Sequence, residues 1–235
     1  MSDDAILEDT LPDDEADDAL TELRDRLLEE VMINVAFDGW TDRSLADAAR
    51  MTDTDPALLA AAFPDGVEDV VLHLHDWADR QMLAALEAEG EAFHDLGMTE
   101  RVEMAVMARL DALAPHKEAV RRGLVLVLSP RVGSRSSRAA MRTVDCIWRA
   151  CGDTATDFNH YTKRLMLLSV LGKTLVCWLG DSSEDHAATR RFLHRRLVEV
   201  THMGKLAGRA GALGRLAEAP WRAAAMVRRR VVGDA

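Results

Sequence analysis

The sequence has few cysteines, few aromatic residues and no long uninterrupted apolar run. Its three cysteines stand at unrelated spacings, which fit neither a disulfide framework nor a CxxC metal knuckle, so we expect reduced, buried thiols. The longest apolar stretch, residues 165–179, contains Lys173 and is too short to span a bilayer. The N-terminus is acidic until Arg24 and resembles neither a secretory signal nor an organellar transit peptide. These absences predict a soluble protein of the bacterial cytoplasm.

The motifs on which many enzymes depend are also missing. The sequence contains no GxSxG, Walker-type or GxGxxG loop. His73 and His75 stand two residues apart on a predicted helix, so they point about 200° away from one another and cannot share a metal ion. We expect them to be solvated or capping histidines. The sequence therefore predicts no catalytic residue, no metal site and no cofactor.

The charge of the chain is unevenly distributed around its net value of −11. Residues 1–18 hold nine acids and no base, a composition that favours a disordered tail. Residues 205–235 hold seven bases and two acids. We expect four parts, which are a disordered acidic tail (1–18), an N-terminal module (19–66), a helical domain (67–204) and a flexible link with a basic amphipathic helix (205–235).

Between the tails, apolar residues recur with the period of a helix, and no segment alternates as a strand does. The fold class is therefore all-α. A polar loop is expected at 130–137, where the sequence reads RVGSRSSR. Helices are expected near 20–38, 67–89, 99–113, 116–128, 138–151, 157–179 and 184–203.

Residues 41–66 have the pattern of a helix-turn-helix. One short helix contains Leu45 and is followed by a polar turn, and a second begins at Pro56. This stretch, with its closing Phe63-Pro64 pair, resembles the N-terminal module of TetR-type regulators. However, residues 51–76 contain six acids and no Lys or Arg, so a phosphate backbone would meet like charge there. We expect a helix-turn-helix remnant that does not bind DNA.

The 165–179 segment is apolar on nearly every face, which is typical of a helix at the centre of a bundle or of one that lines an apolar cavity. A second apolar segment, GLVLVL at 123–128, favours the cavity, because Gly123 and Gly172 both remove side-chain volume. Ordinary core remains the alternative. The candidate lipid-binding residues are Leu124, Leu128, Leu167, Leu168, Leu171 and Trp178.

The C-terminal sequence APWRAAAMVRRRVV gives an amphipathic helix with Trp on its apolar side and arginines on the other. This pattern is typical of an interfacial anchor on an anionic membrane. A frayed basic tail, or a helix that docks on its own body, is the alternative. The candidate membrane-contact residues are Leu213, Leu216, Trp221, Arg222, Val227 and Arg228.

The sequence DFNHYTKR at 157–164, with Trp148 upstream, resembles the signature of the coenzyme Q biosynthesis accessory family, the ninth "coq" protein of mitochondria and its alphaproteobacterial relatives. The resemblance covers about residues 20–204. It extends through MINVAFDGWT (32–41), LSPRVGSRSS (128–137), WLGDSSED (178–185) and RRFLHRRL (190–197).

The resemblance implies a TetR-like all-α bundle that binds lipids, among them isoprenoid quinone precursors, and that forms a homodimer. It further implies a non-enzymatic accessory protein of ubiquinone biosynthesis, peripheral on the inner membrane, which presents its lipid to a di-iron demethoxyubiquinone hydroxylase. The implied hydroxylase-binding residues are Asp157, His160, Tyr161 and Arg164; mitochondrial members have Trp where this chain has His160. The alternative function is that of a TetR-like transcriptional regulator that senses a small apolar effector.

Overall fold

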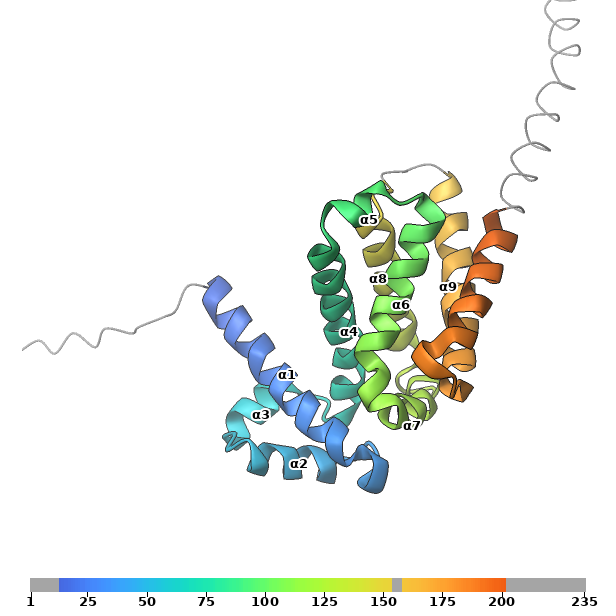
Figure 1. The fold of residues 1–235 in the computed structure, drawn as a ribbon. Helices are drawn as coiled ribbons and strands as arrows, with labels where there is room; N and C mark the ends of the chain where they lie inside the picture. The colour runs from blue at the N-terminus through green and yellow to red at the C-terminus, as the bar shows by residue number, and fades with distance from the viewer. Residues whose placement is uncertain (1–12, 154–157, 202–235) are drawn as a thin grey trace, which may run out of the picture. The chain divides into compact units, whose positions relative to one another are not determined.

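The computed structural model describes residues 13–153 and 158–201, which form helices and turns and contain no strand. The all-α prediction is confirmed (Figure 1). Residues up to Gly180 form one compact unit, and the described residues from Asp181 onward belong to a second. The helices of the first unit are α1 (Asp13–Asp38), α2 (Asp42–Met51), α3 (Pro56–Ala62), α4 (Val67–Glu89), α5 (Glu91–Asp95), α6 (Met98–Leu113), η1 (Ala114–His116), α7 (Lys117–Val127), α8 (Gly133–Ala150) and α9 (Phe158–Gly180).

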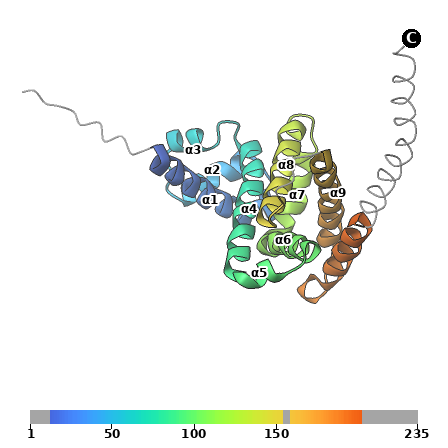
Figure 2. The ribbon, with the colours of Figure 1, turned by 90° about the horizontal axis from the view of Figure 1, so that it is seen from above.

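Helix α4 is the central element of the first unit. It packs against α1, α6, α7 and α8, and both views place it between α1 on one side and α6 and α8 on the other (Figures 1 and 2). Its buried side chains, among them Val70, Trp77 and Met82, therefore face several directions. Gly66 begins the helix at a φ of +63°, and a Cβ there would lie 2.4 Å from an oxygen of Asp42, so the position requires glycine.

The two short helices of the predicted helix-turn-helix are confirmed as α2 and α3. Thr41 and Ser44 form a capping box at the start of α2. Asp55 caps α3 by accepting a hydrogen bond from the Ala57 amide at 2.7 Å. Helix α1 holds the end of α3 through Arg24, whose Nε donates to the Ala62 carbonyl at 2.9 Å.

Two predicted boundaries were wrong. Helix α1 begins at Asp13, inside the 1–18 segment expected to be disordered, because acids in a first turn interact favourably with the helix dipole. Helix α8 begins at Gly133, inside the loop expected at 130–137. Its polar sequence is amphipathic, since Ser136, Ala139 and Ile147 are buried while arginines occupy another face. The short helix α5 was not expected.

In the second unit, Asp181 organises the start of a helix over 187–201. Its carboxylate accepts hydrogen bonds from the backbone amides of Ser183, at 2.9 Å, and Thr189, at 2.7 Å, and from both hydroxyls. Burial raises the pKa of Asp181, but these hydrogen bonds outweigh it and hold the pKa well below its usual range. The gap between the helices expected near 157–179 and 184–203 is thus confirmed. No helix in the described part of the chain has the length and apolarity needed to cross a bilayer.

Candidate functional site

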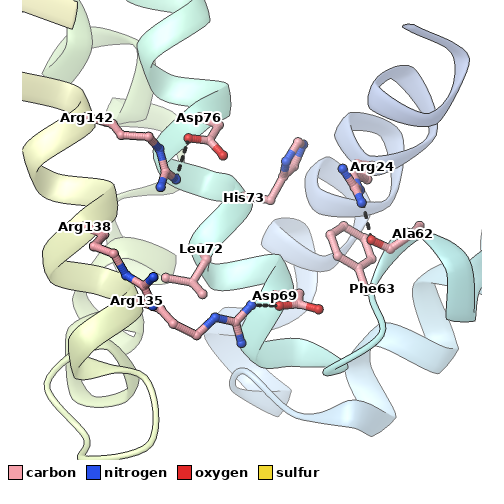
Figure 3. A pocket seen from close by; sticks show the side chains of 10 residues that line it. All are labelled: Arg24, Ala62, Phe63, Asp69, Leu72, His73, Asp76, Arg135, Arg138 and Arg142. Carbon is pink, nitrogen blue, oxygen red and sulfur yellow. Dashed lines mark hydrogen bonds and ion pairs between the residues drawn. The ribbon is translucent and has the colours of Figure 1, made fainter. Parts of the chain in front are cut away.

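The acids that follow the helix-turn-helix are paired with arginines of α8. Arg135 contacts Asp65 at 2.8 Å. Arg135 also contacts Asp69, and Arg142 contacts Asp76 at 3.1 Å (Figure 3). The hydrogen bond that Arg135 donates to Asp69 raises the pKa of Arg135 more than burial lowers it. Part of the negative charge counted in the sequence is therefore balanced by a segment that lies about 70 residues further along the chain.

The exposed surface of α3 remains free of basic residues. Its sequence is PALLAAA, and Leu58 is 54% exposed. Asp53 and Asp55 flank it in the turn before the helix, where Asp55 serves as the cap. In a DNA-binding helix-turn-helix, the second helix lies against the DNA. Here that helix, α3, offers neither Lys nor Arg to a phosphate.

An apolar cavity of about 130 Å³ lies between α4, α6, α8 and α9. Leu168, Leu171 and Leu175 of α9 form one wall, and Gly172 lies among them. A Cβ at Gly172 would meet nothing within 4 Å, so the glycine leaves open space beside the cavity. The remaining lining residues are Val106, Leu110, Ala140, His75, Arg109 and Thr143.

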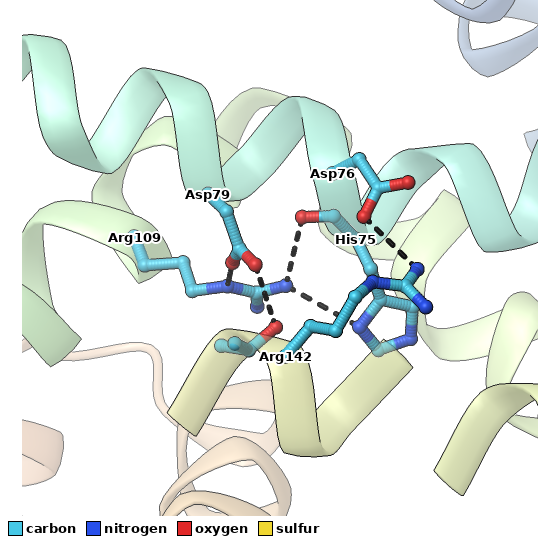
Figure 4. A network of polar contacts seen from close by, with 6 residues as sticks. His75, Asp76, Asp79, Arg109 and Arg142 are labelled. Atoms are coloured by element: carbon cyan, nitrogen blue, oxygen red, sulfur yellow. Dashed lines mark hydrogen bonds and ion pairs between the residues drawn. The ribbon is translucent and has the colours of Figure 1, made fainter. Parts of the chain in front are cut away.

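The last three of these residues make one side of the cavity polar. Arg109 Nε donates to the carboxylate of Asp79 at 2.7 Å, and the Thr143 hydroxyl donates to the other oxygen of Asp79 at 2.8 Å. The Nη2 atom of Arg109 lies 3.4 Å from Nδ1 of His75 (Figure 4). An apolar space with a few fixed polar groups is the usual composition of a small-molecule site.

His75 is neutral in this site at physiological pH. Burial, together with the neighbouring cations Arg109 and Arg142, lowers the pKa of His75 to about 3. Since neighbouring cations oppose protonation, the imidazole remains a neutral donor and acceptor beside the cavity.

The protein is expected to lose stability on acidification through His75. In the unfolded chain the pKa of His75 is about 6.5, so below that pH the unfolded chain binds a proton at His75 and the folded chain does not. Each pH unit from there toward pH 3 therefore lowers the free energy of unfolding by about 1.4 kcal/mol at most. Urea unfolding at pH 7 and pH 5 should show a smaller pH dependence in His75→Gln than in the wild type. His94→Gln, at an exposed position, is the control. Equal pH dependence of the wild type and His75→Gln would contradict the prediction.

The six predicted lipid-binding residues occupy different places. Leu168 and Leu171 line the cavity, and the other four do not. Leu167 is buried elsewhere, Leu124 is half-buried and Leu128 is 81% exposed. Trp178 is fully buried, with the Lys117 ammonium 5.0 Å from its ring centroid.

Gly123 has a packing role that the sequence did not reveal. A Cβ at this position would lie 3.3 Å from Nε1 of Trp40. That indole nitrogen donates to the Ala119 carbonyl at 2.9 Å, which fixes α7 against the end of α1. The glycine thus admits the Trp40 ring and does not enlarge the apolar cavity.

The hydroxylase-binding residues implied by the family lie at and before the start of α9. Asp157 is outside the described residues, and the backbones of His160 and Tyr161 are helical. Arg164 is only 7% exposed and forms an ion pair with Asp145 of α8, so it ties α9 to α8. The candidate membrane-contact residues, from Leu213 to Arg228, lie outside the described residues.

The prediction of solvated or capping histidines was wrong, because helical periodicity does not reveal which partners a side chain meets. His73 is 9% exposed, and its Nε2 lies 2.6 Å from Asp25 of α1, whereas His75 faces α6. Within the described residues no group of three His, Cys, Asp or Glu side chains could hold a metal ion.

All three cysteines are free, as expected, but the expected burial holds for Cys151 alone, because Cys146 and Cys177 are half-buried. Cys151 is fully buried at the end of α8, and its carbonyl accepts a hydrogen bond from Arg101 Nη1 at 3.1 Å. Burial raises the pKa of the Cys151 thiol to about 12, and burial also raises the pKa of Cys146.

The fold has a counterpart among solved structures. A TetR transcriptional regulator from Nitrosomonas europaea superposes with a TM-score of 0.62 at 24% identity, over 77% of this chain and 98% of that chain. At this identity the likeness concerns the fold, and the predicted TetR-like architecture is confirmed.

The COQ9 family model matches residues 133–204, which include α8 and α9. The chain is 32% identical over 189 residues to the mitochondrial ubiquinone biosynthesis protein COQ9 of Xenopus tropicalis, covering 78% of this chain and 59% of that protein. It is 30% identical over 199 residues to the human protein of that name, covering 82% of this chain and 62% of that protein. The chain thus spans less than two thirds of the length of these relatives. It is a relative of the COQ9 proteins, and the family resemblance indicated by its sequence is confirmed.

Proposed function

We propose that this protein is a non-enzymatic, lipid-binding accessory protein of ubiquinone biosynthesis. It holds an isoprenoid quinone intermediate and presents it to a di-iron demethoxyubiquinone hydroxylase at the membrane. Its relatives are named as ubiquinone biosynthesis proteins, which supports the pathway. The observation that carries the lipid-binding part is the apolar cavity beside α9.

The composition of this cavity suits a prenyl chain. Leu168, Leu171 and Leu175 present branched aliphatic side chains, which pack against an isoprenoid without requiring a hydrogen bond. At its polar side, Arg109 and His75 offer donors to a carbonyl or hydroxyl oxygen of a quinone ring. The site therefore combines an apolar surface for the prenyl chain with hydrogen-bond donors for the quinone ring.

The volume of the cavity sets a further condition. Its 130 Å³ is below the about 300 Å³ of an ordinary ligand pocket, so it accommodates only part of a prenyl chain. The rest of an isoprenoid quinone then extends beyond this cavity. Mass spectrometry of the lipids extracted from purified protein tests the proposal, and an extract without isoprenoid quinone or other lipid contradicts it.

The remaining parts of the proposal concern location and assembly. The basic, Trp-containing sequence after residue 205 holds the protein on the inner membrane of a bacterium from the cytoplasmic side. The surface that receives the hydroxylase includes Tyr161, and the protein acts as a homodimer. Because Arg164 is engaged with Asp145, its contribution to that surface is to position the start of α9.

A TetR-like regulator with an apolar effector is the second candidate, and the TetR-like fold favours it. The surface of α3, the second helix of the helix-turn-helix, opposes it. Helix α3 has no basic residue, and its cap is the carboxylate of Asp55, whereas non-specific DNA affinity depends on basic side chains that displace counterions. The accessory function is therefore the one we propose.

Tyr161→Ala is expected to weaken binding of the hydroxylase by about 2 kcal/mol or more, since a Tyr at the centre of an interface is often a hot spot. Deletion of residues 205–235 is expected to leave that binding intact but to reduce sedimentation with anionic liposomes, because it removes Trp221 and six of the arginines. Pull-down and liposome sedimentation measure the two effects. Lys173→Ala, at an exposed position of α9, is the control for the pull-down. Unchanged pull-down with Tyr161→Ala would refute the assigned partner surface, and full sedimentation of the truncated chain would refute the anchor.

A further inference from the structure

A second pocket, of about 440 Å³, lies on the other side of α4 from the apolar cavity, between α1, the end of α3 and α8. Its walls are polar, and four arginines face it (Figure 3). The arginines are Arg24, Arg135, Arg138 and Arg142, and the lining also contains the carboxylates of Asp69 and Asp76.

Three of these arginines come from one face of α8. Arg135, Arg138 and Arg142 follow one another at intervals of three and four residues, which places them along one side of the helix. The outer two are engaged by acids of the α3–α4 region, as described above. Arg138 between them is exposed, and its Nε makes one long hydrogen bond, of 3.4 Å, to the Ser134 carbonyl of its own helix.

Arg24 faces the pocket from the opposite wall, on α1 (Figure 3). Its Nε is bound to the Ala62 carbonyl at 2.9 Å, which leaves the two terminal nitrogens of the guanidinium for another acceptor. The neighbouring Asp25 carboxylate is engaged by His73 and Arg80. Among the described residues, neither Arg24 nor Arg138 has a carboxylate partner.

The charges around the pocket do not balance. Four guanidinium groups face it with two carboxylates, Asp69 and Asp76, which Arg135 and Arg142 already engage, and Asp65 outside the lining is a second partner of Arg135. The other two guanidinium groups, Arg24 and Arg138 on facing walls of the pocket, produce a positive potential between them. An anion with several oxygens satisfies this arrangement, because the planar fork of Arg pairs with two oxygens of a phosphate at once.

We propose that this pocket binds a phosphate-bearing small anion, held between Arg24 of α1 and Arg138 of α8. The volume exceeds that of inorganic phosphate and suits a pyrophosphate or a phosphate monoester with a small substituent. The anion is either free in solution or the headgroup of a lipid. In both cases it links the N-terminal module to α8, because its two arginines come from these separate parts of the first unit.

Isothermal titration of the full-length protein with pyrophosphate at low salt tests the proposal. Arg138→Ala and Arg24→Ala should each raise the Kd at least tenfold. Arg149→Ala, also exposed on α8 but outside the pocket, should change it less than twofold. A parallel titration with short-chain phosphatidic acid below its micellar concentration distinguishes the sources. Binding of phosphatidic acid alone, lost in Arg138→Ala, supports a lipid headgroup, and binding of pyrophosphate lost in Arg138→Ala supports a free anion.

Two outcomes would overturn the proposal. One is the absence of saturable binding of either probe in the millimolar range. The other is an affinity that falls equally in Arg138→Ala and Arg149→Ala, which indicates non-specific attraction to basic residues anywhere on the chain. Circular dichroism establishes that each variant is folded, and Arg138→Gln replaces Arg138→Ala if the alanine variant does not fold.

Discussion

Leu168→Glu is expected to abolish the co-purification of lipid with a protein that remains folded. Leu168 lines the apolar cavity and is itself only partly buried, so the variant can fold with the new side chain in the cavity. A carboxylate without a partner in apolar surroundings is costly. Arg109 lines the same cavity, and an ion pair with it would hold the glutamate where a prenyl chain would lie. The lipid is excluded in either case.

The matched control is Leu165→Glu, because Leu165 lies on the same helix, is 61% exposed and is not a lining residue. Quantitative mass spectrometry of extracted lipid should give the wild-type amount for Leu165→Glu and at least a tenfold lower amount for Leu168→Glu. Wild-type lipid content in a folded Leu168→Glu protein would mean that this part of α9 is ordinary core.

Asp79→Ala is expected to lower the free energy of unfolding by about 3–5 kcal/mol, since it leaves the guanidinium of Arg109 buried without its counter-charge. The two side chains are 11% and 12% exposed, and the carboxylate also accepts the Thr143 hydroxyl. Urea unfolding followed by circular dichroism measures the loss. Replacing both members, as Asp79→Leu with Arg109→Met, should recover most of the stability because no unpaired charge remains.

Asp76→Ala provides the comparison on the same helix. Its ion pair with Arg142 is about half exposed, with side-chain exposures of 44% and 57%, so removal should cost no more than about 1 kcal/mol. If Asp79→Ala and Asp76→Ala proved equally mild, the Asp79–Arg109 pair would not be the buried structural element that its geometry indicates.

Elements whose boundaries depend on local chemistry could be predicted from the sequence. Helices α2 and α3 begin where Thr41 and Asp55 supply caps and where Pro56 fits the first turn, so short-range signals are sufficient. The start of α8 depends on distant partners. Arg135 and Arg142 are stabilised by acids more than 60 residues earlier, and without those partners RVGSRSSR has the composition of a loop.

The candidate site could be predicted only where local sequence signals were sufficient. Leu168 and Leu171 were identifiable because a helix apolar on all faces contacts either core or cavity. The contributions of His75 and Arg109 were not, because their roles follow from burial and from Asp79, which no periodicity reveals. Leu128 has the apolar character of a lining residue, but it is exposed because α7 turns its Gly123 face toward Trp40.

The buried thiol of Cys151 at the end of α8 can be used to measure local opening of the fold. Because the pKa of Cys151 is about 12, its reactive thiolate is scarce at neutral pH, and alkylating reagents have no path to the sulfur while this corner is closed. Modification must wait for α8 to separate from the Arg101 side chain that holds the Cys151 carbonyl. The alkylation rate of this thiol therefore reports how often the end of α8 opens.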